Sequence, residues 1–192
     1  MTGISLDTAS ARARLVEIVK ARSFQEGPEM RLASGKTSTI YFNMKPTMLD
    51  SEGAYLIASL ILDHLEGVQA DLIGGLEMGA VPIASSVTTL AHTRGRKLPA
   101  FFVRKQAKEH GTKSLIEGLG HDETITGKRV VIVEDVTTTG GSSIKAADAV
   151  RQAGGIVVQV ITIVDRLDGA EEAFAAAEYP FYALLTRADF KN

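Results

Sequence analysis

An unbroken run of branched apolar residues, VVIV at 130–133, constrains the fold of this chain most strongly. A strand with one face in water alternates apolar and polar side chains, whereas a strand that is apolar throughout needs cover on both faces. Helices packed on both sides of a parallel sheet supply that cover. Apolar strands of this kind alternate with helical segments from residue 51 onward, which predicts an α/β fold with an open, doubly wound, mainly parallel sheet.

The expected elements follow from periodicity and from turn residues. The N-terminal segment 6–22 reads as a helix whose apolar stripe contains Leu6, Ala9, Ala13, Val16 and Val19. Residues 30–32 and 39–43 read as a hairpin. After them we expect helices at 51–66, 79–93, 142–153 and 168–178, and strands at 71–75, 99–103, 129–133, 156–164 and 181–185. No linker or repeat interrupts the chain, so 1–192 is predicted to be one domain, with 1–50 as N-terminal helix and hairpin and 51–192 as the α/β core.

Charge and composition exclude several classes of protein. The 21 Lys and Arg residues against 23 Asp and Glu residues give a net charge of -2, so there is no overall positive field to attract nucleic acid or an anionic membrane. The absence of cysteine excludes thiolate catalysis and cysteine-bound zinc, and it fits a reducing compartment. The longest apolar stretches, 55–62 and 157–164, are far shorter than the roughly 20 residues of a membrane-spanning helix. Since the N-terminal segment also lacks the apolar region of a secretion signal, we expect a cytoplasmic protein without nucleic-acid or membrane partners.

The stretch VVIVEDVTTTGGSS, residues 130–143, combines a buried strand, an acidic pair, a Thr/Gly loop and a helix start. Gly140 and Gly141 allow backbone N–H groups to converge on an anion, and the hydroxyls around them add donors at a helix N-terminus, where negative charge is favoured. The carboxylates of Glu134 and Asp135 can accept from sugar hydroxyls and bind Mg²⁺ directly or through water. The stretch therefore predicts a phosphosugar site; the alternative is an acidic strand end, a turn and a serine helix cap.

A second functional candidate is the segment 104–120. Arg104, Lys105, Lys108 and His110 give this glycine-containing segment positive charge. When a reaction releases pyrophosphate, negative charge builds up on the departing oxygens, and cations that arrive there stabilise the transition state more than the ground state. We therefore expect a cationic lid that moves over the leaving group; the alternative is a solvated charged loop.

Four motifs resemble those of known enzymes. VVIVEDVTTTGGS (130–142) resembles the phosphoribosyl pyrophosphate (PRPP) binding motif of type I phosphoribosyltransferases, and RKQAKEHG (104–111) resembles the R-K-x-x-K-x-H-G loop of orotate phosphoribosyltransferases. SGKTS (34–38) with YFN (41–43) resembles that family's S-G-x-x-S and the aromatic pair of its N-terminal hood. VDR (164–166) resembles a strand end whose arginine meets orotate. The resemblance extends from about residue 30 to the end of the chain.

The resemblance implies the type I phosphoribosyltransferase fold, with the hairpin as a hood. It implies that orotate and PRPP give orotidine 5′-phosphate and pyrophosphate in pyrimidine synthesis, with Mg²⁺ as cofactor and in a homodimer whose lid reaches the partner's site. The implied catalytic residues are Lys108, His110 and Asp135. The implied PRPP-binding residues are Arg104, Lys105, Lys108, His110, Glu134, Asp135, Val136, Thr137, Thr138, Thr139, Gly140, Gly141 and Ser142. The implied orotate-binding residues are Thr138, Arg166, Tyr41 and Phe42. No direct protein ligand of Mg²⁺ is expected, because PRPP would carry the ion, with Asp135 in contact through water.

Several positions leave alternatives open. Phe42 is as well explained by burial in the core as by contact with the base, and Arg166 is also explained by a surface ion pair with Asp165. Ala33 and Met78 stand where relatives often carry basic residues, so pyrophosphate would rely on backbone N–H groups and on the lid lysines. One alternative function is a purine phosphoribosyltransferase of the same fold, against which the lid and hood motifs argue. The other is a non-enzymatic PRPP-sensing regulator that binds nucleic acid, against which the balanced charge argues.

Overall fold

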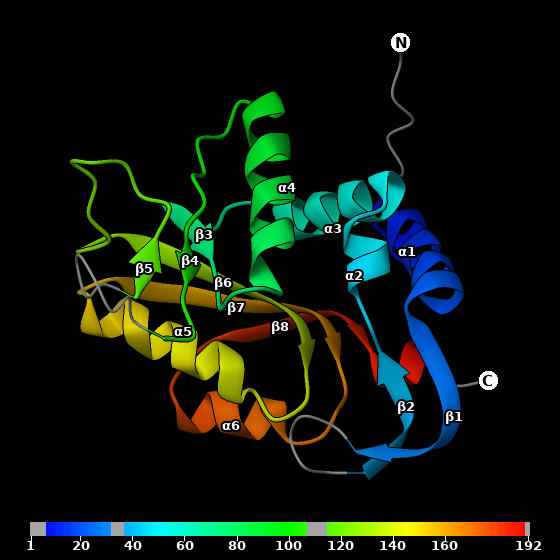
Figure 1. The fold of residues 1–192 in the computed structure, drawn as a ribbon. Helices are drawn as coiled ribbons and strands as arrows, with labels where there is room; N and C mark the ends of the chain where they lie inside the picture. Colours follow the sequence, from blue (N-terminus) through cyan, green and yellow to red (C-terminus); the bar gives the residue numbers. More distant parts are fainter. Residues whose placement is uncertain (1–6, 32–36, 107–114, 191–192) are drawn as a thin grey trace.

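The computed structural model describes residues 7–31, 37–106 and 115–190. Helices and strands alternate along the chain much as the sequence predicts (Figure 1). Among the helices in these ranges, none is long and apolar enough to cross a membrane. In chain order the elements are α1 (Thr8–Arg22), β1 (Phe24–Arg31), β2 (Thr37–Phe42), α2 (Lys45–Met48), α3 (Ser51–His64), β3 (Leu72–Gly74), α4 (Ala80–Thr93), β4 (Phe102–Val103), β5 (Ile116–Glu117), β6 (Arg129–Thr137), α5 (Gly141–Gln152), β7 (Ile156–Asp165), α6 (Ala170–Ala176), β8 (Phe181–Thr186) and a 3₁₀ turn, η1 (Arg187–Phe190).

The central sheet has the strand order β3-β6-β7-β8, and each neighbouring pair is parallel. The predicted strand 99–103 runs beside β3 through the parallel bridges Ile73–Ala100 and Leu76–Val103, but only β4 is regular, and it pairs antiparallel with β5. The parallel, doubly wound arrangement confirms the expected fold class.

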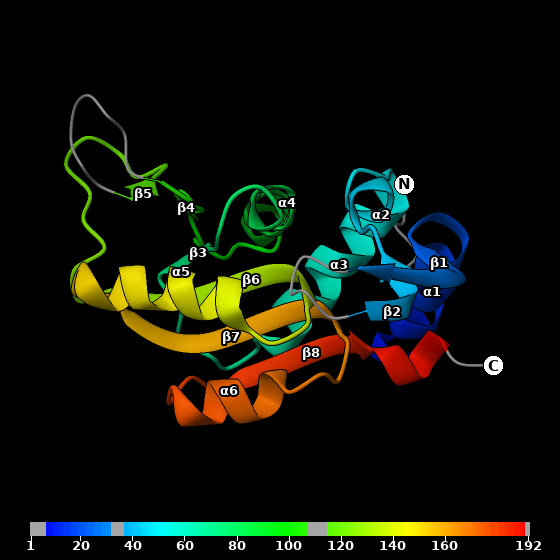
Figure 2. The same ribbon diagram turned by 60° about the horizontal axis from the view of Figure 1, so that its bottom comes forward.

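Each face of the sheet has its own core, because successive residues of a strand point to opposite faces. Val131 and Val133 of β6 pack among residues of α1, α3 and α4, whereas Val130 and Ile132 pack among residues of α5 and α6. None of these side chains is more than 1% exposed. Figure 2 shows α4 on one side of the sheet and α6 on the other. Both faces are therefore covered, which is why the strand carries no polar face.

The hairpin of β1 and β2 lies near the carboxyl ends of β6, β7 and β8 (Figure 1). It begins at Phe24, earlier than the expected residue 30. Three aromatic rings fix its base to the core: the ring centroids of Phe24 and Phe42 are 5.4 Å apart, those of Phe24 and Phe190 5.5 Å, and those of Phe42 and Phe190 5.0 Å. The last described turn of the chain, η1, thus holds the hairpin beside the edge where the parallel strands end.

The first helix, α1, packs through a different stripe from the expected one. Leu15, Ile18 and Val19 are buried, while Ala9 and Ala13 are exposed. The larger side chains remove more apolar area from water than the alanines do, so α1 turns that side toward α3 and η1. The expected stripe was therefore wrong at Ala9 and Ala13, whereas Val19 is buried and Val16 packs against the core. Leu6 lies outside the described residues.

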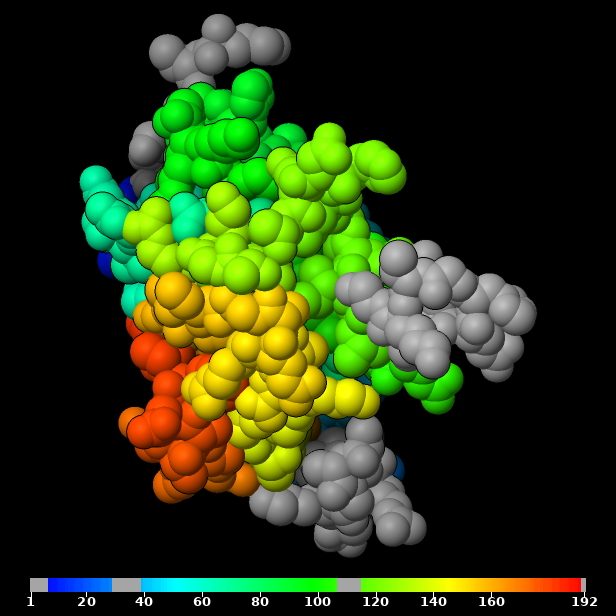
Figure 3. Space-filling model, turned by 90° about the vertical axis from the view of Figure 1, so that its left-hand side faces the viewer, coloured from blue at the N-terminus to red at the C-terminus, as the bar shows by residue number. Residues whose placement is uncertain are grey.

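The amino ends of the strands are covered by the segment 118–128, which precedes β6. In Figure 3 this segment (yellow-green) lies between α4 (green) and α5 (yellow). The N–H of Gly127 donates to the carbonyl of Gly154 at 2.8 Å, and the hydroxyl of Thr126 donates to the carbonyl of Ala153 at 3.0 Å. These bonds fix the segment to the end of α5.

Candidate active site

The carboxyl end of β6 leads through a tight loop into α5. Gly140, which caps α5, has φ 80°, a left-handed conformation that side chains other than glycine rarely adopt. A Cβ at this position would lie 3.1 Å from Cζ of Phe174, so both the backbone and the packing require glycine. The loop borders a cavity of about 270 Å³ that is lined by Glu134, Val136 and residues 137–143.

This cavity is rich in hydrogen-bond donors. Oγ1 of Thr137 and Oγ of Ser143 are buried, and neither has a hydrogen-bond partner among the described residues. The N–H groups in the first turn of α5 lack acceptors within the helix, and the helix dipole favours an anion there. Since buried polar groups are nearly always paired in folded proteins, this set of donors fits a phosphate group. The structure thus brings the predicted residues 137–142 together around one cavity.

The acidic pair is next to the same cavity along the chain, and Glu134 lines it. Glu134 is 7% exposed, and its Oε1 accepts from the N–H of Asp135 at 3.0 Å, while Oδ1 of Asp135 accepts from the N–H of Val136 at 2.8 Å. Burial raises the pKa of Glu134 well above its usual value of 4.5, and the neighbouring Asp135 raises it further. The carboxylate oxygens suit ribose hydroxyls or a hard cation such as Mg²⁺. No group of three or more His, Asp or Glu within the described ranges could hold a metal by itself.

A second loop, residues 75–79 between β3 and α4, lies against the acidic pair. A Cβ at Gly79 would lie 2.9 Å from Oδ1 of Asp135 and 3.0 Å from Oε1 of Glu134, so the loop approaches both carboxylates closely. Met78 is 63% exposed and carries no charge. The loop can therefore offer an anion its backbone N–H groups but no cationic side chain of its own.

The cationic segment reaches the same region from β4. Lys105 donates its backbone N–H to Oε1 of Glu77 at 2.9 Å, which places it beside the loop 75–79. Arg104 forms an ion pair with Glu117, with a distance of 3.4 Å between Nη1 and Oε1. The predicted residues Lys108 and His110 lie outside the described residues.

On the other side of the phosphate cavity, Arg166 follows the end of β7. The backbone N–H of Arg166 donates to the carbonyl of Thr137 at 2.9 Å, so Arg166 is next to the phosphate loop. Its guanidinium is buried and donates to the carbonyl of Ile40 at 3.1 Å and to Oδ2 of Asp168 at 3.4 Å. The alternative of a surface ion pair with Asp165 was wrong, because the acidic partner is Asp168 and the side chain is only 3% exposed.

The two aromatic residues of β2 face opposite ways, as their adjacency requires. Tyr41 is 39% exposed. Phe42 is buried against Phe24 and Phe190, so the structure assigns its ring to the core, and we do not retain it as an orotate contact. Thr138 is half-buried on the phosphate loop and lines the cavity.

Sequence reasoning missed four residues that the structure brings to this region. Ser143 could have been found, because it is a hydroxyl one residue beyond the predicted loop. Asp168 carries a weaker signal, as an acidic residue shortly after Arg166. Glu77 and Lys145 give no signal in the sequence, because their contacts join segments that only the tertiary structure brings together.

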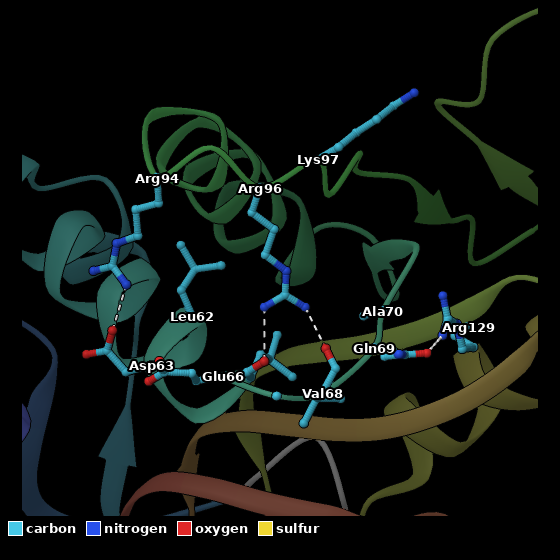
Figure 4. Close-up of a pocket in the computed structure, with 12 residues that line it drawn as sticks. Leu62, Asp63, Glu66, Val68, Gln69, Ala70, Arg94, Arg96, Lys97 and Arg129 are labelled. Carbon is cyan, nitrogen blue, oxygen red and sulfur yellow. Dashed lines mark hydrogen bonds and ion pairs between the residues drawn. The ribbon is translucent and has the colours of Figure 1, made fainter.

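A wider cavity, of about 840 Å³, lies at the amino-end edge of the sheet. Its arginines are engaged in holding the connection between α3 and β3 (Figure 4). Arg94 donates to Asp63 at 2.6 Å, and Arg96 donates to the carbonyls of Leu65 and Val68 at 3.0 Å and 2.9 Å. Ligands of doubly wound sheets bind beyond the carboxyl ends of the strands. The smaller cavity at the end of β6 is therefore the candidate active site.

Comparison with known proteins agrees with this geometry. Residues 48–177 match the family described as "Phosphoribosyl transferase domain", so the fold and the site define a phosphoribosyltransferase. An orotate phosphoribosyltransferase from Rhodopseudomonas palustris (strain BisB18) is 56% identical over 96% of this chain and 98% of that protein. One from Bradyrhizobium sp. (strain BTAi1 / ATCC BAA-1182) is 54% identical over 96% of this chain and 100% of that protein. The chain belongs to the orotate phosphoribosyltransferase family, which confirms the resemblance and the enzyme class predicted from the motifs.

A solved structure supports the same assignment. The crystal structure of Mycobacterium tuberculosis H37Rv orotate phosphoribosyltransferase in complex with PRPP is 36% identical, with a TM-score of 0.76, and the match covers 93% of this chain and 98% of that one. Both the fold and the sequence of that protein are therefore similar to those of this chain over nearly their full lengths.

Proposed function

We propose that this chain transfers the phosphoribosyl group of PRPP to orotate, giving orotidine 5′-phosphate and pyrophosphate as a step in pyrimidine synthesis. The observation that carries the proposal is the donor-lined cavity beside an acidic pair, both within residues 134–143, with Glu134 buried. A phosphosugar needs an anion site and acceptors for its hydroxyls side by side, and this stretch supplies both. The names of the similar proteins support orotate as the base.

In this proposal PRPP is bound by two stretches of the chain, residues 134–142 and residues 104–110. Residues 137–142 bind the 5′-phosphate through N–H and hydroxyl groups, and Glu134 and Asp135 accept from the ribose hydroxyls. Arg104 and Lys105 serve the pyrophosphate, together with Lys108 and His110 of the lid. Because charge grows on the departing pyrophosphate, these cations stabilise the transition state more than the bound substrate.

Orotate would be held at the carboxyl edge, beneath the hairpin. Arg166 meets its carboxylate, a geometry that a guanidinium can satisfy with two hydrogen bonds, and Thr138 and Tyr41 border the base. The bond from a ring nitrogen of orotate to the anomeric carbon forms while the bond from that carbon to pyrophosphate oxygen breaks, and the proton of that nitrogen is released to solvent. The chain acts by orienting the two reactants and stabilising charge, so no covalent enzyme intermediate is needed.

Mg²⁺ enters this proposal with PRPP rather than through a protein cage. When bound, it neutralises charge on the pyrophosphate oxygens. Asp135 would hold the ion through water, since carboxylate oxygen suits a cation that prefers oxygen ligands and keeps part of its water shell.

We also propose that the enzyme is a homodimer, as the family resemblance implies. The surface of α3 and α4 carries a cavity of about 380 Å³ whose lining includes Tyr55, Ala58 and Leu90. Tyr55 is 47% exposed. A second copy that covers this groove would remove apolar surface from water.

The reaction is tested by mixing the purified chain with orotate, PRPP and Mg²⁺ and following the loss of orotate by its ultraviolet absorbance. Asp135→Asn should lower kcat/KM for PRPP by at least about tenfold, because the amide accepts less strongly from sugar hydroxyls and carries no charge for the metal. Asp122→Asn, on the exposed segment 118–128, is the matched control and should leave the rate unchanged. Consumption of a purine base instead of orotate would overturn the proposal, and normal turnover of Asp135→Asn with unchanged PRPP affinity would overturn the role of Asp135.

A further inference from the structure

The main chain of Lys105 is held by side chains from two separate segments. Its N–H donates to Oε1 of Glu77 at 2.9 Å, and its carbonyl accepts from Nζ of Lys145 at 3.3 Å. Glu77 belongs to the loop that lies against the acidic pair, and Lys145 belongs to α5, which begins at the phosphate loop. The loop 75–79 and the helix that follows the phosphate loop are thus both tied to Lys105.

The contact from Glu77 completes a main-chain ladder. The N–H of Val103 donates to the carbonyl of Gly75 at 2.8 Å, and the N–H of Glu77 donates to the carbonyl of Val103 at 2.8 Å. After Glu77 the chain turns into α4 and leaves this ladder. The carboxylate of Glu77 therefore takes the position of the next acceptor for Lys105, and an ionised acceptor makes a stronger hydrogen bond than a carbonyl does.

The arrangement leaves the charge of Lys105 available to the site. Glu77 accepts from the backbone of Lys105 rather than from its ammonium. The positive charge of Lys105 acts on Glu134, where it favours the ionised carboxyl, although burial outweighs it and the pKa stays raised. Lys105 is therefore fixed through its backbone while its side-chain charge acts on Glu134.

We propose that Glu77 and Lys145 are positioning residues that hold Lys105 at the pyrophosphate side of the active site. This inference rests on the proposed function, because it takes Lys105 as a PRPP contact. Neither Glu77 nor Lys145 is proposed to touch PRPP or orotate. Both act through Lys105.

The test compares KM values for the two substrates in the full-length enzyme. Glu77→Ala should raise KM for PRPP by about tenfold, the loss expected for one charge-assisted hydrogen bond, and should leave KM for orotate unchanged. Glu77→Gln keeps an acceptor oxygen and should stay within about twofold of wild type. Lys145→Met should act like Glu77→Ala, while Lys145→Arg should be close to wild type. Glu66→Ala, exposed at the opposite edge of the sheet, is the matched control for loss of a glutamate.

A double-mutant cycle separates positioning from a general effect on the fold. In a Lys105→Ala background, Glu77→Ala should cause no further rise in KM for PRPP, because the residue it positions has lost its charge. If the two effects multiply, or if Glu77→Ala and Lys145→Met raise KM for both substrates equally, the inference is overturned. If Lys105→Ala alone leaves KM for PRPP unchanged, the proposed PRPP role of Lys105 has failed instead. If Glu77→Ala does not fold, Lys145→Met and Lys145→Arg replace it in the same cycle with Lys105→Ala, and the same outcomes support or overturn the inference.

Discussion

Glu134 is a buried carboxyl group that we propose accepts from ribose hydroxyls, so both stability and PRPP binding should depend on its ionisation and therefore on pH. Its pKa is raised chiefly by burial, so between the usual value of 4.5 and the raised one the folded protein holds a proton that the unfolded chain has lost. Its contribution to stability therefore falls as pH rises through that window. Ribose hydroxyls donate best to the ionised carboxylate, so binding of PRPP should release the proton.

We expect PRPP affinity to rise with pH through the Glu134 pKa, with proton release on binding. Calorimetry in buffers of different ionisation enthalpy measures both quantities. Glu134→Gln cannot ionise, so its PRPP affinity should be lower at the upper end of the range and less dependent on pH. The phosphates of PRPP also titrate, but they contribute equally to both proteins. The difference between wild type and Glu134→Gln therefore isolates the contribution of Glu134. If PRPP affinity depends on pH equally in wild type and Glu134→Gln, and both release the same number of protons on binding, the role of Glu134 is contradicted.

Arg166 carries a second prediction at the residue scale. Arg166→Gln should weaken orotate binding by about 10- to 100-fold, because a charge-assisted pair contributes about 1.5–3 kcal/mol, and should change PRPP binding little. Arg166 also bonds to Ile40 and Asp168, so the Tm must be measured alongside. Binding of a pyrimidine without the carboxylate, such as uracil, serves as the internal control and should be unaffected. Equal weakening of uracil and orotate would show that Arg166 acts through the fold rather than through the carboxylate.

At the scale of elements, the phosphate loop depends on Gly140. Gly140→Ala should lower the free energy of unfolding by about 1 kcal/mol or more, since alanine resists the left-handed conformation and its Cβ would press on the Phe174 ring. It should also weaken PRPP binding. The change is measured by denaturant unfolding and by titration with PRPP.

Gly67 offers a matched control for this prediction. It has φ 78°, and a Cβ there would meet nothing within 4 Å, so Gly67→Ala incurs the backbone cost without the contact. The difference between the two alanine variants measures the Phe174 contact. Weakened PRPP binding in Gly67→Ala would show that the loop itself is not responsible.

Elements were predicted well where local pattern decides and less well where packing decides. The apolar run in β6 and the glycines before α5 specify a buried strand and a turn. The facing stripe of α1 could not be found, because both stripes carry apolar residues and only contact with α3 and η1 selects Leu15 and Ile18. The strand 99–103 was expected whole, yet its pairing is shared between β3 and β5.

At the scale of the whole molecule, the proposed homodimer predicts that subunits complement each other. Lys108→Ala should lower turnover more than PRPP binding, as expected for an interaction that strengthens in the transition state. Mixing Lys108→Ala chains with Asp135→Asn chains, under conditions that exchange subunits, gives heterodimers with one site that has both an intact loop and an intact lid. Activity should approach about a quarter of wild type if half of the chains pair in this way. Verified exchange without recovery would mean that each lid serves its own subunit.

The sequence by itself determined the class of fold, the phosphate loop and the family, because each depends on residues that are close along the chain. Apolar runs require two covered faces, and the motif at 130–142 carries strand, acids, loop and helix start in one stretch. The single-domain boundaries, the cytoplasmic location and the roles of individual site residues stay predictions. The tertiary structure alone decided that Phe42 belongs to the core, that Asp168 rather than Asp165 pairs with Arg166, and that Glu77 and Lys145 meet at Lys105. These contacts join residues distant in sequence, whose distances are set by how helices, hairpin and sheet pack against one another.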